Sequence, residues 1–176
     1  GHNTSTYLSI ATQQEETVLA INDTHILQQL TPQLLNGSRD LIRHSGVVLA
    51  DCNLTAEAIE WVFTIADDIP VFIDTVSEFK AAKMKTWFTR IHTLKPTQKE
   101  LAILWGQPIH SDADRVLAVN SLHQQGVKRI FVCLEDESVF CSEKDGEQFL
   151  LTPPEHTVVY SFGADDAFMA GLLYSF

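Results

Sequence analysis

The segment that most clearly indicates a chemical function is Gly-Ala-Asp-Asp at residues 163–166. It follows the apolar run 157–160 and precedes the helical run 168–173. A Gly-Ala start allows a tight turn into a helix, whose first N–H groups and positive dipole end favour a phosphoryl group. A carboxylate in the first helical turn can accept a proton from an attacking hydroxyl, and Asp166 stands there. In the alternative interpretation, Asp165 or Asp166 only caps the helix.

Polar residues also follow three predicted strands. Asp51 ends the first strand and Asn53 follows it, Asp74 ends the second, and Lys95 follows the third. Ligands of an open α/β sheet gather beyond the carboxyl ends of its strands, so we expect these four residues on one edge, together with residues 163–166. A single strand-end Asp or Asn often just caps the next helix. Four polar residues on the same edge favour a binding site.

The elements that must position these residues follow from the hydrophobic pattern. Residues 7–11 and 17–21 predict a β-hairpin around the polar turn 12–16. From residue 23 onward helices and strands alternate, which is typical of a parallel sheet with helices on its faces. The expected helices cover residues 32–44, 55–66, 78–90, 97–105, 111–125 and 168–173. The expected strands cover residues 46–51, 71–74, 91–94, 129–134, 138–141, 148–151 and 157–160.

The composition limits the classes of partner. Lys and Arg total 12 against 23 Asp and Glu, for a net charge of −11, so we expect no nucleic acid partner. No stretch approaches the roughly 20 apolar residues of a membrane span, and no secretory leader opens the chain, so we expect no membrane partner. Three cysteines without a Cys-x-x-Cys pair favour reduced thiols in a cytoplasmic protein over disulfides or zinc.

The order of the motifs resembles the ribokinase/PfkB family of carbohydrate kinases, and within it the members that phosphorylate pseudouridine. The segments that carry this resemblance are residues 3–9, 20–23, 50–53, 71–77, 91–96 and 163–171. The resemblance implies a ribokinase-like three-layer α/β/α fold with a mostly parallel sheet. Residues 1–22 are then a β lid segment and residues 23–176 a partial, Rossmann-like kinase core. Family members have on the order of 300 residues, so we expect N-terminal and C-terminal parts to be missing.

The resemblance also implies an activity: transfer of the ATP γ-phosphoryl group to a primary hydroxyl of a sugar or nucleoside, with pseudouridine as the expected acceptor. ATP and Mg²⁺ are the implied cofactors. Asp166 would be the catalytic base, and Glu100 would hold the metal through water. The residues expected to frame the anion hole are Gly163, Ala164 and Asp165. Those expected at the nucleotide phosphates are Lys95, Thr97, Glu135 and Ser138. Those expected toward the substrate are Asn22, Asp23, Asp51 and Asn53.

Four of these positions depart from the family pattern on the nucleotide side. Thr97 replaces the Asn of Lys-Pro-Asn-x-x-Glu, although Thr97 and Glu100 also match a helix capping box. Glu135 and Ser138 replace both glycines of a Thr-x-Gly-x-x-Gly stretch, and Asp165 replaces the second glycine of Gly-Ala-Gly-Asp. Repulsion between unit charges near 4 Å is roughly 4 kcal/mol at a surface-like dielectric. We therefore expect weakened binding of MgATP.

Two hypotheses from other classes stay open. In the first, the chain is a degenerate kinase fold that acts as a binding or structural module without catalysis. In the second, it is a flavodoxin-like binding domain. A kinase-type sheet without its first strands would leave an edge unpaired. We therefore expect self-association through residues 7–21 or a neighbouring edge.

Overall fold

The computed structural model describes residues 3–11, 17–155 and 163–176. The turn expected at residues 12–16 and the strand expected at residues 157–160 lie outside this part of the chain. Within it, the order of elements is a two-stranded hairpin, then helices interspersed with strands, then three consecutive strands and a final helix.

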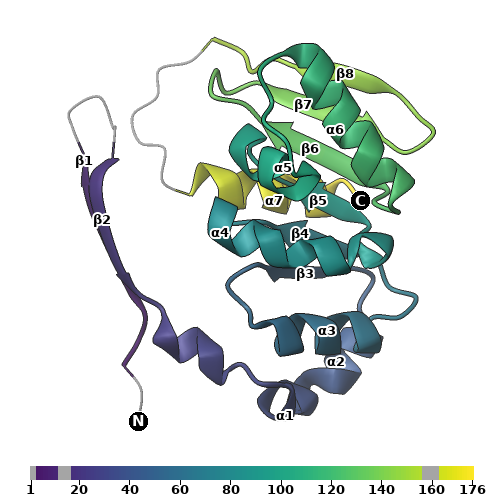
Figure 1. Cartoon of the computed structure of the whole chain (residues 1–176). Coiled ribbons are helices and arrows are strands. Elements are labelled where there is room, and N and C mark those ends of the chain that lie inside the picture. The colour runs from purple at the N-terminus through teal and green to yellow at the C-terminus, as the bar shows by residue number, and fades with distance from the viewer. Residues whose placement is uncertain (1–2, 12–16, 156–162) are drawn as a thin grey trace.

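The hairpin consists of β1 (Thr6–Ala11) and β2 (Thr17–Asp23), which pair antiparallel. It stands apart from the rest of the molecule, on the side where the last helix begins (Figure 1). Leu8 lies opposite Ile21 and Ile10 opposite Leu19, so these four residues share one surface of the hairpin. All four are exposed, and we call this surface the apolar face of the hairpin.

A second sheet has six strands in the order of the sequence. The strands are β3 (Val48–Asp51), β4 (Val71–Asp74), β5 (Thr93–Lys95), β6 (Arg129–Cys133), β7 (Val139–Glu143) and β8 (Gln148–Leu151). Strands β3 to β6 are parallel, whereas β7 and β8 continue the sheet antiparallel. The expected mostly parallel sheet is confirmed.

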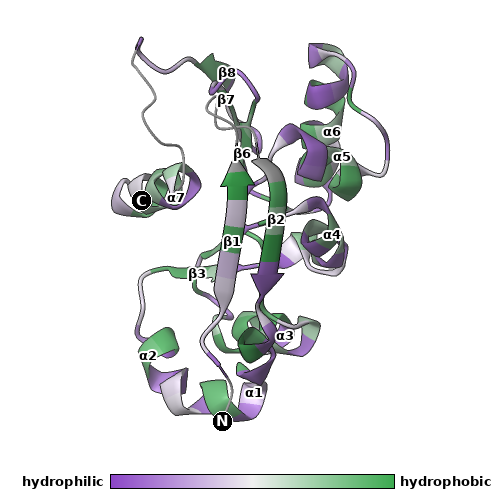
Figure 2. Cartoon of the chain, turned by 90° about the vertical axis from the view of Figure 1, so that its left-hand side faces the viewer, coloured by the Kyte–Doolittle hydropathy of each residue, from purple (hydrophilic) through white to green (hydrophobic). Residues whose placement is uncertain are grey.

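Helices cover both faces of this sheet. On one face lie α3 (Ala56–Ile65), α4 (Glu78–Ala81), α5 (Gln98–Trp105) and α6 (Asp112–Gln124). The last helix, α7 (Ala164–Tyr174), lies on the other face (Figure 2). Two short helices, α1 (Pro32–Leu35) and α2 (Arg39–Arg43), precede β3. None of the helices in the described part of the chain is long and apolar enough to cross a membrane.

Two of the predicted long helices are wrong, because the structure divides each of them into shorter pieces. Residues 32–44 form α1, a 3₁₀ turn (η2, Asn36–Ser38) and α2, because Asn36 and Gly37 are poor helix formers. Residues 78–90 form α4 followed by two 3₁₀ turns, η3 (Ala82–Thr86) and η4 (Phe88–Arg90). The β-branched and aromatic residues at 86–89 disfavour a continuous α-helix there.

The core has two parts. The larger part lies between the sheet and helices α3 to α6 and includes fully buried side chains such as Ile73, Leu94 and Ile130. The smaller part joins α7 to the sheet, where the ring of Phe168 meets that of Phe131 edge-on at 6.1 Å. This packing fixes where α7 begins relative to the sheet.

Candidate functional site

The strand ends that the sequence placed on one edge are neighbours in the sheet. Asp51 pairs with Asp74, and Asp74 pairs with Lys95, each at the last position of its strand. Lys95 Nζ lies 3.0 Å from Asp74 Oδ2 and 2.9 Å from Asp165 Oδ1. The second contact brings the first turn of α7 to the carboxyl edge of β5. The expectation of a shared edge is therefore confirmed.

Lys95 is the buried cation of this edge, with 4% of its side chain exposed. Burial lowers the pKa of Lys95, but hydrogen bonds and charge from Asp165 and Asp74 outweigh burial and raise it. The ammonium therefore stays protonated between two carboxylates. This trio carries one more negative charge than positive, which opposes an incoming anion.

The Glu100 carboxylate is held in place by hydrogen bonds. Its Oε2 accepts from Thr75 Oγ1 at 2.6 Å and from the Thr97 backbone N–H at 2.8 Å. The Glu100 N–H donates to Thr97 Oγ1 at 3.3 Å. Thr97 and Glu100 thus form a capping box at the start of α5, as their spacing predicted. The role of Glu100 toward a metal stays a prediction.

Two lysines hold the loop that follows β3. Asp51 accepts hydrogen bonds from the backbone N–H and the side-chain amide of Asn53, both at 2.8 Å. Lys80 Nζ donates to Asn53 Oδ1, and Lys83 Nζ donates to two backbone carbonyl oxygens of the loop at 2.9 and 2.8 Å. Sequence reasoning missed both lysines, together with Thr75. The available signal was the three-residue spacing of Lys80 and Lys83 in the helical segment after β4, and the position of Thr75 directly after the last residue of that strand.

Glu135 and Ser138 lie in the turn between β6 and β7. Glu135 is exposed and pairs with Lys99 of α5 at 3.2 Å. Ser138 is buried, and its N–H and hydroxyl both donate to Asp136 Oδ1, which lowers the pKa of the Asp136 carboxyl. Glu137, at φ 63°, takes the left-handed conformation of this turn. The positions where bare backbone was expected therefore carry ordered polar side chains.

The start of α7 depends on Gly163. Its φ of 85° lies in the left-handed region that favours glycine, and its carbonyl accepts the Ala167 N–H at 2.9 Å. Gly163 is the N-cap residue, and no side chain in the described part of the chain caps this helix end. The interpretation of Asp165 or Asp166 as the cap is therefore wrong. Ala164 and Asp166 are exposed in the first turn.

Asn22 and Asp23 lie elsewhere, at the end of the hairpin. Both are exposed. Asp23 Oδ1 accepts from the His25 N–H at 3.2 Å and lies 2.8 Å from His25 Nδ1, and these hydrogen bonds lower the pKa of the Asp23 carboxyl. Within the described residues, neither Asn22 nor Asp23 is hydrogen-bonded or ion-paired to the sheet edge. The structure thus places the expected substrate residues in two separate groups.

The implied nucleotide and magnesium can be tested against these contacts. Carboxylate oxygens are the ligands that magnesium prefers, so the donor type at this edge fits. The described residues hold no group of three or more His, Cys, Asp or Glu side chains arranged around a metal position. A phosphate would have to approach a buried ammonium that two carboxylates already share. The arrangement of Lys95 does not fit a nucleotide phosphate while Asp165 stays in place.

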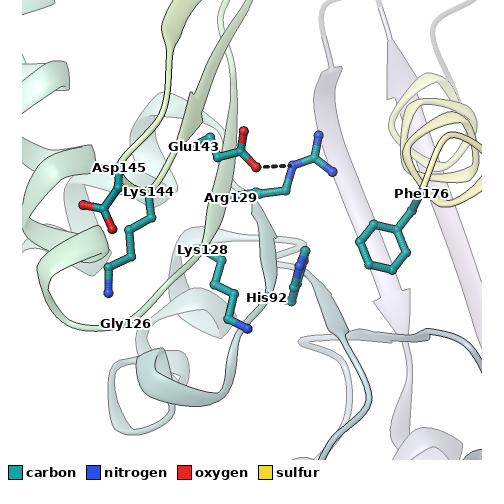
Figure 3. Close-up of a pocket in the computed structure, with 8 residues that line it drawn as sticks. All are labelled: His92, Gly126, Lys128, Arg129, Glu143, Lys144, Asp145 and Phe176. Carbon is teal, nitrogen blue, oxygen red and sulfur yellow. Dashed lines mark ion pairs between the residues drawn. The ribbon is translucent and has the colours of Figure 1, made fainter.

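A separate hollow of about 430 Å³ lies at the opposite edge of the sheet, where β5 and β6 begin (Figure 3). Its lining includes His92, Lys128, Arg129 and Phe176. The His92 ring stacks on Phe72 and meets Phe176 edge-on at 5.0 Å. None of the residues expected to bind substrate or nucleotide lines this hollow.

Comparison with known proteins connects these contacts to a family. The sequence pattern of the "pfkB family carbohydrate kinase" matches residues 1–176. "Uncharacterized sugar kinase YeiI" of Escherichia coli K12 is 76% identical over 176 residues, which are 100% of this chain and 49% of that protein. "Pseudouridine kinase" of the same strain is 36% identical over 172 residues, covering 98% of this chain and 55% of that protein.

Solved structures share the fold. A putative sugar kinase from Clostridium perfringens superimposes with a TM-score of 0.81 at 28% identity, over 99% of this chain and 55% of that one. Arabidopsis thaliana ribokinase, complexed with ribose and ATP, superimposes with a TM-score of 0.76 at 20% identity, over 95% and 54%. The ribokinase-like fold is confirmed. The chain spans about half the length of these relatives.

Proposed function

Because the chain belongs to the pfkB family of carbohydrate kinases, we propose that its sheet edge is the catalytic site of a sugar or nucleoside kinase. The reaction transfers the ATP γ-phosphoryl group to a primary hydroxyl, and pseudouridine is the acceptor. One observation carries the proposal: the Lys95–Asp165 contact holds the first turn of α7, with Asp166, beside the strand ends. The similarity to a pseudouridine kinase supports the choice of acceptor.

Asp166 is the base of this reaction. It is exposed in the first turn of α7, next to the residue that contacts Lys95, so an acceptor hydroxyl can reach its carboxylate from solvent. The carboxylate takes the hydroxyl proton as the oxygen attacks the γ-phosphorus, and the bond from that phosphorus to the bridging oxygen breaks to release ADP. The backbone N–H groups that follow Gly163 supply partial positive charge at the helix end. Glu100 would hold magnesium through water, and the metal would supply further neutralisation of the phosphate charge.

The acceptor side of the proposal uses the loop after β3. Asp51 and Asn53 are fixed there by each other and by Lys80 and Lys83. A fixed carboxylate and amide suit the hydroxyls of a ribose ring, because they offer hydrogen-bond acceptors and a donor in set directions. Asn22 and Asp23 join this group only when the hairpin lies over the sugar.

A second candidate function is a kinase fold without catalysis that serves as a binding or structural module. The observation that favours it is the pairing of Lys95 with both Asp74 and Asp165, which leaves the expected phosphate lysine neutralised. Glu135 and the buried Ser138 point the same way, because they replace the bare backbone that a nucleotide could approach closely.

Transfer of labelled γ-phosphate from MgATP to pseudouridine tests the proposal, with ribose and adenosine as comparison acceptors. The assay uses this chain and a form extended to the length of its relatives. Asp166→Asn should abolish transfer and leave the circular dichroism spectrum and melting temperature nearly unchanged. Asp68→Asn removes the same charge from an exposed position away from the sheet edge and should leave transfer intact.

Two outcomes count against the proposal. Transfer that survives Asp166→Asn refutes the assignment of the base. Absence of transfer in every form, including one with Glu135→Gly, Ser138→Gly and Asp165→Gly combined, favours the module without catalysis.

A further inference from the structure

The two side chains of the ion pair between Lys95 and Asp165 differ in how far they are exposed to solvent. Lys95 is 4% exposed and has a second carboxylate partner in Asp74 on the neighbouring strand. Asp165 is 67% exposed and belongs to the first turn of α7. The cation is therefore fixed in the protein, whereas the Asp165 carboxylate can rotate into solvent.

We propose that the carboxylate of Asp165 occupies the place of a phosphate oxygen on Lys95 and excludes anionic phosphates until it moves away. The inference rests on the proposed function in that it takes Lys95 as the phosphate-binding group. It goes beyond that function because it assigns to Asp165 a competition with the ligand.

The shared chemistry of carboxylate and phosphate groups supports this competition for Lys95. A carboxylate and a phosphate both accept hydrogen bonds from an ammonium, and both are favoured at a helix N-terminus. Asp165 meets both conditions, since it contacts Lys95 Nζ at 2.9 Å from the second position of α7. Its carboxylate is also tethered, so it competes intramolecularly with any free anion.

Release of Asp165 leaves a usable site. Asp74 Oδ2 still lies 3.0 Å from Lys95 Nζ, and Asp74 Oδ1 still accepts the Val76 N–H at 3.0 Å. Lys95 therefore stays charged and held in place when Asp165 is absent. An ion pair with one largely exposed partner is weak enough to open.

Titration with inorganic phosphate and with pyrophosphate tests the proposal on the chain as it is. Binding is followed by NMR of the Lys95 side chain, together with calorimetry. Asp165→Asn, which keeps the shape and removes the charge, should bind phosphate at least about tenfold more tightly than the unchanged chain. Asp165→Glu should stay weak, and Asp68→Asn controls for the change in net charge.

The titration of Lys95 itself is the second readout. The Lys95 pKa should fall in Asp165→Asn, because the largest contribution that raises it is lost. Combining Lys95→Met with Asp165→Asn should abolish the gain in phosphate binding. Equal or weaker phosphate binding by Asp165→Asn, or an unchanged Lys95 pKa, overturns the proposal.

These outcomes are independent of the transfer assay. A gain in phosphate binding by Asp165→Asn without any phosphoryl transfer would contradict the proposed kinase activity and support the competition by Asp165. Transfer that depends on Asp166, combined with phosphate binding that Asp165→Asn does not improve, would do the opposite. Melting curves of each variant confirm that it is folded before binding is compared.

Discussion

At the scale of single residues, the charged side chains of the sheet edge are held by partners from other elements. Lys95 of β5 pairs with Asp74 of β4 and Asp165 of α7, and Glu100 of α5 accepts from the hydroxyl of Thr75. Such partners keep buried charge satisfied, and removing one leaves the other without compensation. Substitutions that remove a buried partner at this edge should therefore have large effects on stability.

Thr75→Val tests this directly. Thr75 is fully buried, and its hydroxyl donates to Glu100 Oε2 and to the Lys95 carbonyl oxygen. Valine has the same shape without the hydroxyl, so Glu100 loses a buried donor and the free energy of unfolding should fall by about 1–3 kcal/mol. Urea denaturation measures it. Thr64→Val, at an exposed position on α3, should change stability by less than about 0.5 kcal/mol.

Two cysteines near the edge should be unreactive in the folded protein. Burial raises the pKa of Cys52 to about 12 and that of Cys133 to about 11. The thiolate is the form that alkylates, so iodoacetamide should modify both residues slowly at neutral pH and rapidly in denaturant. Mass spectrometry of the time course gives the rates. Fast modification of Cys133 in the native protein would contradict the half-buried position of its thiol.

At the scale of elements, local patterns located the strands but not every helix or contact. The apolar runs at 46–51, 71–74 and 91–94 predicted strands, and the polar residues at their ends predicted the shared edge, which the register confirms. The breaks within 32–44 and 78–90 were missed, because the apolar spacing of these segments outweighed their poor helix formers at 36–37 and 86–89 in the prediction. The pairing of Lys95 with Asp165 joins residues far apart in sequence, and no local pattern encodes it.

His92, which directly precedes β5, should make the free energy of unfolding depend on pH. Burial, then the charges of Lys128 and Arg129, lower the pKa of His92, while Glu143 opposes them more weakly. The unfolded chain therefore binds more protons than the folded one just below the usual histidine pKa of about 6.5. Stability should consequently fall as the pH drops from about 6.5 through the lowered value.

Denaturation at several pH values measures this dependence. His92→Phe retains an aromatic ring against Phe72 and removes the titrating group, so the fall in stability should become shallower. His110→Gln, at an exposed position, should leave the dependence unchanged. An equally steep fall in His92→Phe would assign the pH dependence to other groups.

At the scale of the whole molecule, the hairpin stands apart from the core with its apolar face uncovered (Figure 1). Contiguous exposed apolar side chains on a two-stranded sheet favour pairing with another surface. We expect the chain to self-associate as its concentration rises, through the hairpin or a neighbouring strand edge. Light scattering gives the mass as a function of concentration.

The variant that combines Leu8→Lys and Leu19→Lys places two charges on the apolar face of the hairpin and should shift the chain toward the monomer. Leu41→Lys changes an exposed leucine of α2 and serves as the matched control. A monomeric mass for the unchanged chain at high concentration would show that the hairpin does not mediate association.

The chain has the fold of a pfkB kinase, and we expect the carboxylates near its sheet edge to oppose a bound nucleotide. Calorimetric titration with MgATP tests it most directly. The unchanged chain should bind with a Kd weaker than about 1 mM, equivalent to about −4 kcal/mol. Glu135→Gly combined with Asp165→Gly should restore measurable affinity, because both side chains oppose the polyanion. Micromolar binding of MgATP by the unchanged chain would show that these carboxylates do not oppose the nucleotide.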